Sequence, residues 1–388
     1  SLSGTISLNG GSLTAGTPGS TAFPGTFTTS NTGVITLTGG ALNINATGDV
    51  SVGATITNAG VADIQSGGSI NVGAGISSSD SNIRFRSPVV LTNSAAISTG
   101  SGSAGNIQFD DTVNDDVSNG TDRTLTLTAG TGTVTFSNTV GATQALSNLS
   151  VTESGGVTFG GTTYTANTQS YDAGGNNFSF NAGAATTLTA SSSLGLSNGT
   201  VSLSDGSDLT VTSGSGALSI ASIQGTSNED VSINAGTGSI SVGAIGDGAG
   251  INDIALSASG GVTLSGNITS SDNGGADPAS LAITGGVTLG GDVAIDLSDG
   301  GGVDLTIAGV VDDDSAGGSN RALSVNLGTG NLAFSNNVGS TQALGSLTVT
   351  NAGNVTFSQA LNVDGALNQT TGSGTTTFTG ATSAGSID

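Results

Sequence analysis

The stretch Phe136–Phe159 reads FSNTVGATQALSNLSVTESGGVTF, and the stretch Phe334–Phe357 reads FSNNVGSTQALGSLTVTNAGNVTF. The two stretches lie 198 residues apart, and 16 of their 24 aligned positions are identical. A tandem repeat of this length is typical of architectures in which one structural unit stacks on the next. The sequence therefore predicts a repetitive, built structure.

The match extends upstream without a gap to about residue 82, so that Arg123 aligns with Arg321 and Phe85 with Ile283. Further upstream the two copies still align, at a slightly smaller offset. The repeating unit is therefore roughly 190–198 residues long, and the chain of 388 residues is close to twice that length. We expect two tandem units in one continuous solenoid, residues 1–194 and 195–388.

Within each unit the apolar residues alternate with polar ones, as in Leu125-Thr-Leu127, Val134-Thr-Phe136 and Leu281-Ala-Ile283. A period of two is the pattern of a half-buried β-strand. Turn-forming pairs such as Asp205-Gly206 and Asp299-Gly300 separate the runs. The chain is thus predicted to consist of many short strands joined by turns.

Short strands and turns could form a sandwich, a barrel or a β-helix. The chain has no Trp and only 3% aromatic residues, whereas sandwich cores usually contain large aromatic side chains. Small residues suit the narrow interior of a β-solenoid, and the strand cores recur every 18–24 residues or so inside the long repeat. We predict an all-β protein, a right-handed parallel β-helix with almost no helix.

The composition excludes several classes of partner. The net charge is −23, and all four basic residues are Arg, so clustered cations that could bind nucleic acid are missing. No apolar run of about 18 residues occurs, so we expect no membrane insertion. The absence of Cys rules out disulfides and thiol chemistry.

The coils also resemble a known family. Segments such as Leu42-Asn-Ile44, Val50-Ser-Val52-Gly and Ile233-Asn-Ala, with TVGATQALSNLSVT and NVGSTQALGSLTVT, resemble the β-helices of filamentous haemagglutinin-like bacterial surface adhesins and other giant repetitive surface proteins. The resemblance implies a secreted, extracellular protein at the bacterial cell surface.

The chain is not expected to be an enzyme. It has no His, Cys or Lys to act as a base or nucleophile at neutral pH. Paired carboxylates could cleave a polysaccharide, and the candidates are Asp110, Asp111, Asp115 and Asp116. An active site is normally present once, however, and part of this cluster recurs in the second copy.

The repeated acidic residues are Asp115, Asp116, Asp313 and Asp314, each pair lying seven and eight residues before Arg123 or Arg321. One interpretation is a solvated loop in which each arginine pairs with its own carboxylates. Another is a Ca²⁺ site, because that ion prefers oxygen ligands. A third is a contact between neighbouring molecules. No cofactor other than Ca²⁺ is implied.

Several other residues invite a functional interpretation. Alternation points Phe85 inward and Arg84 and Arg86 outward, where the arginines form a solvated face or contact an acidic surface of another copy. The repeated Phe residues are expected to stack in the core. Tyr164 and Tyr171 occur only in the first unit and are candidates for exposed aromatic side chains. Gln144 and Gln342 are expected to cap a turn or to hydrogen-bond the backbone of another coil.

Together these features predict an extracellular structural β-solenoid that forms a cell-surface fibre, sheath or adhesin stalk. Its partners would be further repeats of the same chain or other copies of itself. The alternative is an adhesin module that recognises surface glycans through a lateral face of the β-helix.

Overall fold

A computed structural model of the chain describes residues 6–9, 13–15, 18, 24–29, 34–102, 105–116, 122–246, 250–271, 279–314 and 320–388. The fold is a parallel β-solenoid of about 14 turns, with 58% of residues in strands and 1% in helix. The predicted all-β solenoid is therefore confirmed. Over the same residues, no helix is long and apolar enough to cross a membrane.

The chain divides into two compact units. Unit 1 comprises residues 1–182, 186–191 and 196–199, and unit 2 comprises residues 183–185, 192–195 and 200–388. Strand β22 (Leu194–Leu203) contains residues of both.

Unit 1 contains three stacks of parallel strands, here named A, B and C. Stack A consists of β1 (Ile6–Asn9), β4 (Val34–Thr38), β7 (Thr55–Ala59), β10 (Ile76–Ser78), β13 (Ala95–Ser98), β16 (Thr124–Thr128) and β18 (Leu146–Glu153). Stack B consists of β2 (Leu13–Ala15), β5 (Leu42–Ala46), β8 (Ala62–Ser66), β11 (Ile83–Phe85), β14 (Ile107–Phe109), β17 (Val134–Phe136) and β19 (Val157–Phe159). Stack C consists of β3 (Phe27–Thr29), β6 (Val50–Val52), β9 (Ile70–Val72), β12 (Val89–Leu91) and β15 (Val113–Asp115).

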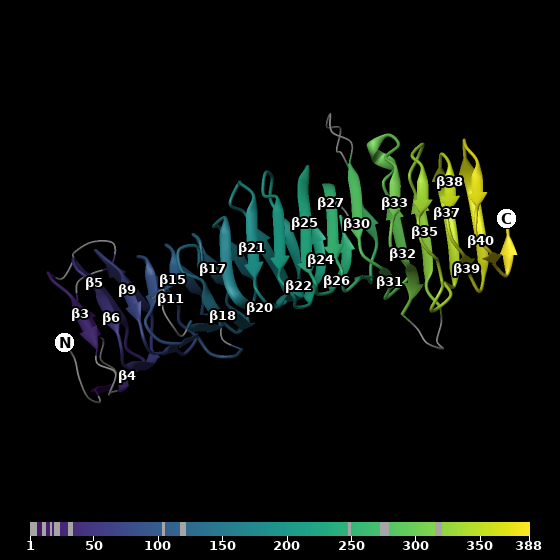
Figure 1. Cartoon of the computed structure of the whole chain (residues 1–388). Coiled ribbons are helices and arrows are strands. Elements are labelled where there is room, and N and C mark those ends of the chain that lie inside the picture. Colours follow the sequence, from purple (N-terminus) through teal and green to yellow (C-terminus); the bar gives the residue numbers. More distant parts are fainter. Residues whose placement is uncertain are drawn as a thin grey trace. The chain divides into compact units, whose positions relative to one another are not determined.

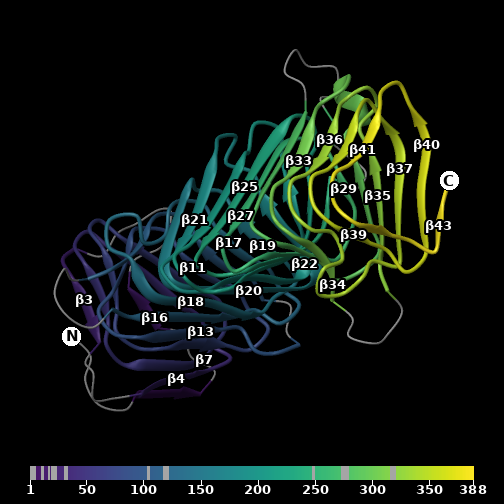
Figure 2. The same cartoon turned by 45° about the vertical axis from the view of Figure 1, so that its right-hand side comes forward.

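The long strand β20 (Thr163–Phe180) winds past all three stacks of unit 1. It pairs with β18 of stack A, with β19 of stack B, and through the bridge Val140↔Tyr164 with stack C, before β21 (Thr186–Ala190) follows. Strands β4, β7, β13 and β16 lie on one side of the unit in Figure 2, and β11, β17 and β19 on another. Successive coils therefore place equivalent residues in parallel register.

Unit 2 also contains three parallel stacks, named D, E and F. Stack D consists of β23 (Leu209–Ser213), β25 (Glu229–Gly236), β27 (Ile251–Ala258), β30 (Ser280–Thr284), β33 (Leu305–Ile307), β36 (Leu332–Phe334), β38 (Val355–Phe357) and β41 (Thr376–Phe378). Stack E consists of β24 (Leu218–Gln224), β26 (Ile240–Ile245), β28 (Val262–Leu264), β31 (Val287–Leu289), β34 (Val311–Asp313), β39 (Leu361–Asn362) and β42 (Thr382–Ser383). Stack F, which begins at the end of β26, consists of β29 (Ile268–Thr269), β32 (Val293–Asp296), β35 (Ala322–Asn326), β37 (Ser346–Ala352), β40 (Ala366–Gly372) and β43 (Ser386–Ile387).

The short 3₁₀ helix η1 (Ser298–Gly300) follows β32. The predicted turn pair Asp299-Gly300 lies within it. The strands of each unit follow one another in sequence order along the coils in Figure 1.

The interior of each unit is filled by the inward side chains of these alternating strands. Most three-residue strands show the pattern buried, intermediate, buried, as in Val134–Phe136. The rings of Phe85, Phe109, Phe136, Phe159 and Phe180 stack inside unit 1, with neighbouring centroids 4.5–6.4 Å apart. Phe334, Phe357 and Phe378 stack in the same way in unit 2, at 5.2 and 5.1 Å. The predicted core stacking of the repeated Phe residues is confirmed.

A short column of polar side chains lies in stack B at the residues just before β11 and β14. Asn82 Oδ1 accepts a 2.8 Å hydrogen bond from the backbone N–H of Asn106, and Asn106 Oδ1 accepts one of 2.9 Å from Thr133. Each side chain thus satisfies a backbone donor that the turn leaves without a strand partner.

The same device recurs along stack D. The backbone N–H of Asp230 donates to Asp208 Oδ1 at 3.0 Å, and that of Asp253 donates to Asp230 Oδ1 at 3.1 Å. Further along, Asn331 Oδ1 accepts from the Asn354 N–H, and Asn354 Oδ1 accepts from the Thr375 N–H. Asn and Asp residues between the strand cores therefore tie several consecutive coils together.

Candidate functional site

The repeated acidic pair of unit 1 lies where β15 ends. The Asp115 side chain is buried, and its Oδ2 accepts a 2.7 Å hydrogen bond from the backbone N–H of Arg123. Its Oδ1 accepts from the Asp116 N–H at 2.7 Å and from Arg123 Nη1 at 3.3 Å. Asp116 Oδ1 lies 2.6 Å from the same Nη1. This arrangement, which we call the aspartate clamp, joins the two ends of the segment between Asp115 and Arg123.

Unit 2 repeats the clamp at the equivalent residues. Asp313 is buried, its Oδ2 accepts from the Arg321 N–H at 3.1 Å, and its Oδ1 accepts from the Asp314 N–H at 2.8 Å. The guanidinium Nε of Arg321 lies 3.4 Å from Asp314 Oδ1. The expected local pairing of each arginine with its own carboxylates is therefore confirmed. The centres of the two loops, residues 117–121 and 315–319, lie outside the described residues.

The clamp does not have the form of a calcium site. Ca²⁺ takes six to eight oxygen ligands, and among the described residues no three acidic side chains gather in a way that could hold a metal ion. In unit 1 the Arg123 guanidinium stands where a cation would neutralise the carboxylate pair. A Ca²⁺ site at Asp115, Asp116, Asp313 and Asp314 thus stays a prediction, without support from this geometry.

Gln144 and Gln342 connect these clamps to the next coil through the backbone. The Asp115 N–H donates to the Gln144 carbonyl at 3.2 Å, and the Asp313 N–H donates to the Gln342 carbonyl at 3.3 Å. These contacts use main-chain carbonyls, which any residue could provide, so the predicted role of the glutamine side chains stays a prediction. The Gln342 side-chain Nε2 donates to Asn320 Oδ1, another side chain, at 3.4 Å.

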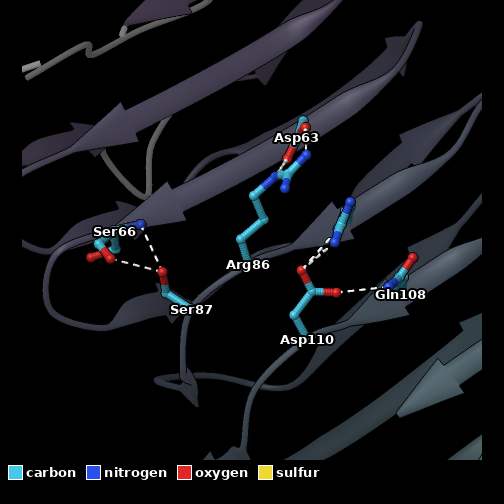
Figure 3. Close-up of polar contacts among 7 residues, drawn as sticks. Asp63, Ser66, Arg86, Ser87, Gln108 and Asp110 are labelled. Atoms are coloured by element: carbon cyan, nitrogen blue, oxygen red, sulfur yellow. Dashed lines mark hydrogen bonds and ion pairs between the residues drawn. The ribbon is translucent and has the colours of Figure 1, made fainter. Parts of the chain in front are cut away.

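Arg84 and Arg86 point outward from β11, and Phe85 between them is buried, as alternation predicts. Arg86 forms two hydrogen bonds with Asp63 on the preceding coil, at 2.6 and 2.8 Å (Figure 3). Arg84 Nε donates to Asp110 on the following coil at 2.8 Å. Both arginines therefore bind carboxylates of their own chain, and the hydrogen bond with Asp63 raises the pKa of Arg86.

The carboxylates considered for catalysis are engaged in the same kind of contact. Asp110 accepts hydrogen bonds from Arg84 and from Gln108 Nε2, the latter at 2.8 Å (Figure 3). Asp111 Oδ1 accepts from the Thr112 N–H at 2.7 Å. Asp110 thus lies against the Arg84 guanidinium and the Gln108 amide, which is the arrangement of an ion-pair partner. That the chain is not an enzyme stays a prediction.

The prediction that Tyr164 and Tyr171 are exposed is wrong. Both side chains are fully buried, and they pack edge-on against Phe159 at 4.9 and 5.2 Å between ring centroids. Burial raises the pKa of both phenols. An aromatic platform for sugars therefore cannot be built from these two residues.

Sequence reasoning also missed the polar residue beside them. Gln169 is buried, and its Nε2 donates to the carbonyls of Tyr164 and Thr189, at 3.0 and 2.7 Å. Its Oε1 accepts from the Tyr171 hydroxyl at 2.7 Å. The network is fully satisfied and fixes the register of β20 inside the core.

A second missed residue is Glu229, one of only two glutamates in the chain. Its buried carboxylate accepts hydrogen bonds from the backbone N–H groups of Thr226 and Ser227, at 2.8 and 3.0 Å, and from both hydroxyls. Burial raises the pKa of Glu229, but these hydrogen bonds outweigh it and leave the pKa below its ordinary value. Glu229 acts as the cap of a turn.

The polar column of stack D contains a third such group. Asp230 stands between Asp208 and Asp253 on consecutive coils, linked to them through the backbone N–H bonds described above. Burial raises the pKa of Asp230, the bond from the Asp253 N–H lowers it, and the charges of Asp208 and Asp253 raise it again. The three carboxylates therefore repel one another, while the hydrogen bonds that link their coils are kept.

The comparisons with known proteins leave the resemblance to filamentous haemagglutinin-like adhesins as an expectation. No family model matches the chain, and neither a curated protein nor a solved structure matches it. The solenoid fold and its internal contacts are therefore the basis for any functional conclusion.

Proposed function

We propose that this chain is an extracellular structural segment of a bacterial surface fibre, sheath or adhesin stalk. Its parallel coils would hold other parts of the assembly at a distance. The neighbours of the segment would be further repeats of the same chain or other copies of it.

One observation carries the proposal. The duplicated sequence has a duplicated local structure, in which Asp115 and Arg123 make the same backbone contact as Asp313 and Arg321. A repeated internal clamp serves a scaffold, because stacked repeats derive their stability from nearest-neighbour contacts. The outward arginines of unit 1 also bind carboxylates on adjacent coils.

Electron microscopy of the native surface material, with and without a calcium chelator, tests the proposal. We expect regular rods or filaments whose axial repeat matches one sequence unit, roughly 40 Å for strands stacked about 4.8 Å apart. Their persistence in chelator would leave the clamps as internal ion pairs, and their collapse would assign the aspartates to a metal. Globular particles with no axial repeat would overturn the proposal.

A further inference from the structure

We propose that a hollow on the outer face of stack B binds one neutral sugar residue, a role beyond that of a spacer. The hollow has a volume of about 290 Å³ and is lined by Thr133, Gly155–Thr158, Gly175–Asn177 and Ser179. This volume is close to the lower end of small-molecule sites, about 300 Å³. It suits a single small unit better than a long chain.

The hollow exists because the polar column of stack B loses one side chain. Val134, Val157 and Phe178 are partners on three consecutive coils, so the residues just before them, Thr133, Gly156 and Asn177, share one column. Earlier in this column Asn82 and Asn106 provide side chains. Gly156 provides none, and its φ of +132° is one that favours glycine.

Unit 2 shows the same position with its side chain in place. The residue 198 positions after Gly156 is Asn354, whose Nδ2 donates to Asn331 at 3.0 Å and whose Oδ1 accepts from the Thr375 N–H. The amide of Asn354 thus occupies and bridges the column. The hollow is therefore a departure of unit 1 from the pattern that the second copy follows.

The polar groups that line the hollow are available to a ligand. In the part of the chain that the structure describes, the hydroxyls of Thr158 and Ser179 and the amide of Asn177 make no side-chain hydrogen bond with other protein groups. Thr158 and Ser179 are partners on neighbouring parallel strands, so their Cα atoms lie about 4.8 Å apart and their side chains both point outward. They face the same solvent-exposed hollow.

The lining selects the chemistry of the ligand. It contains hydroxyl and amide groups that both donate and accept, with neither a charged nor an aromatic side chain. An anion would find no cation there, and the net charge of −23 would repel it. Each hydroxyl of a neutral sugar ring can both donate and accept a hydrogen bond. The hydroxyl and amide groups of the lining can do the same, so the two surfaces match.

The test uses the full chain labelled with ¹⁵N and three neutral probes, the methyl glycosides of glucose, galactose and mannose. We expect at least one of them to cause saturable amide shifts at Gly155–Thr158 and Gly175–Ser179. Glycerol and inorganic phosphate serve as controls and should cause none there. Equal shifts with glycerol, or no saturable shift with any glycoside, would overturn the proposal.

Matched variants locate the site. Thr158→Phe fills the hollow and should abolish the saturable shifts, whereas Thr356→Phe, at the equivalent outward position of unit 2, should leave them intact. Asn177→Ala removes one exposed amide, leaves the strands unchanged and should weaken binding about fivefold, the effect of one net hydrogen bond. Binding that survives both Thr158→Phe and Asn177→Ala would place the ligand elsewhere and contradict the assignment.

Discussion

The buried carboxylate of Asp115 holds the backbone N–H of Arg123, eight residues further along the chain, at 2.7 Å. Asp313 does the same for Arg321. Because the carboxylate also binds the Asp116 N–H and the guanidinium, it satisfies three donors at the base of one loop. The clamp is thus a structural element whose loss can be measured locally.

Asp115→Ala should destabilise the coil around β15 by about 2–3 kcal/mol, since it leaves buried donors without an acceptor. Hydrogen exchange at the amides of Asp116 and Arg123 reports this loss directly. Asp116→Ala is the matched control, because that carboxylate is partly exposed and its ion pair is worth about 0–1 kcal/mol. Equal protection in the two variants would contradict the clamp.

Asp230→Asn should stabilise unit 2 at neutral pH by about 0.2–1 kcal/mol. The amide still accepts the Asp253 N–H through Oδ1 but no longer repels Asp208 and Asp253. The folded pKa of Asp230 is raised, so wild-type stability rises as pH falls through that pKa, and the advantage of the variant fades at low pH. Thermal melts across the acidic range measure this.

Asn331→Asp is the reverse change in the same column. It places a carboxylate against Asp304, whose Oδ1 now accepts from Asn331 Nδ2 at 2.9 Å, and should lower the melting temperature of unit 2 at neutral pH. A rise in that temperature would mean that charge repulsion does not govern the column.

Glu229→Gln should destabilise the turn at Thr226 by about 1–2 kcal/mol at neutral pH, because the backbone N–H groups of Thr226 and Ser227 then donate to a neutral amide oxygen and lose the charge that strengthens their hydrogen bonds. The folded pKa of Glu229 is lowered, so its contribution is present above the unfolded value of about 4.3 and is lost as pH falls through the folded pKa. Denaturant titrations at neutral and acidic pH should therefore converge for variant and wild type. A difference that grows on acidification would contradict the sign.

Tyr171→Phe should cost about 1–3 kcal/mol, since it leaves the Gln169 Oε1 buried without its donor. A double-mutant cycle with Gln169→Leu isolates the pair, and the double variant should be less unstable than the sum of the single changes. Additive losses would show that the two side chains act independently. Ultraviolet titration gives a second readout, because burial raises the pKa of both phenols and native phenolate should appear only well above its ordinary range.

Much of the fold follows from the sequence because period-two alternation and the long repeat are both local signals. In Val134-Thr-Phe136, for example, the alternation alone predicts which side chains are buried, and no information about neighbouring coils is needed. The outward direction of Arg84 and Arg86 also follows from alternation. The identity of their partners, Asp63 and Asp110, cannot be predicted in this way, because these residues lie on other coils and the coils differ in length.

Tyr171 shows why parts of the interior were misjudged. The buried positions run from Tyr164 and Ala166 to Gln169 and Tyr171, so the inward parity changes by one residue within β20. The polar side chain of Gln169 at an inward position also interrupts the alternation of apolar and polar residues from which the buried face is predicted. The sugar-sized hollow was equally hidden, since it depends on what one glycine leaves out of a column formed by three coils.

The polar columns give the solenoid a direction. In the hydrogen bonds of these columns described above, the acceptor belongs to the earlier coil and the donor to the next. Asn82 thus accepts from Asn106, and Asn331 accepts from Asn354. A coil that forms first already presents the oxygen that its successor requires. A chain that emerges from its amino end can therefore assemble coil by coil as it appears, each turn templating the one that follows.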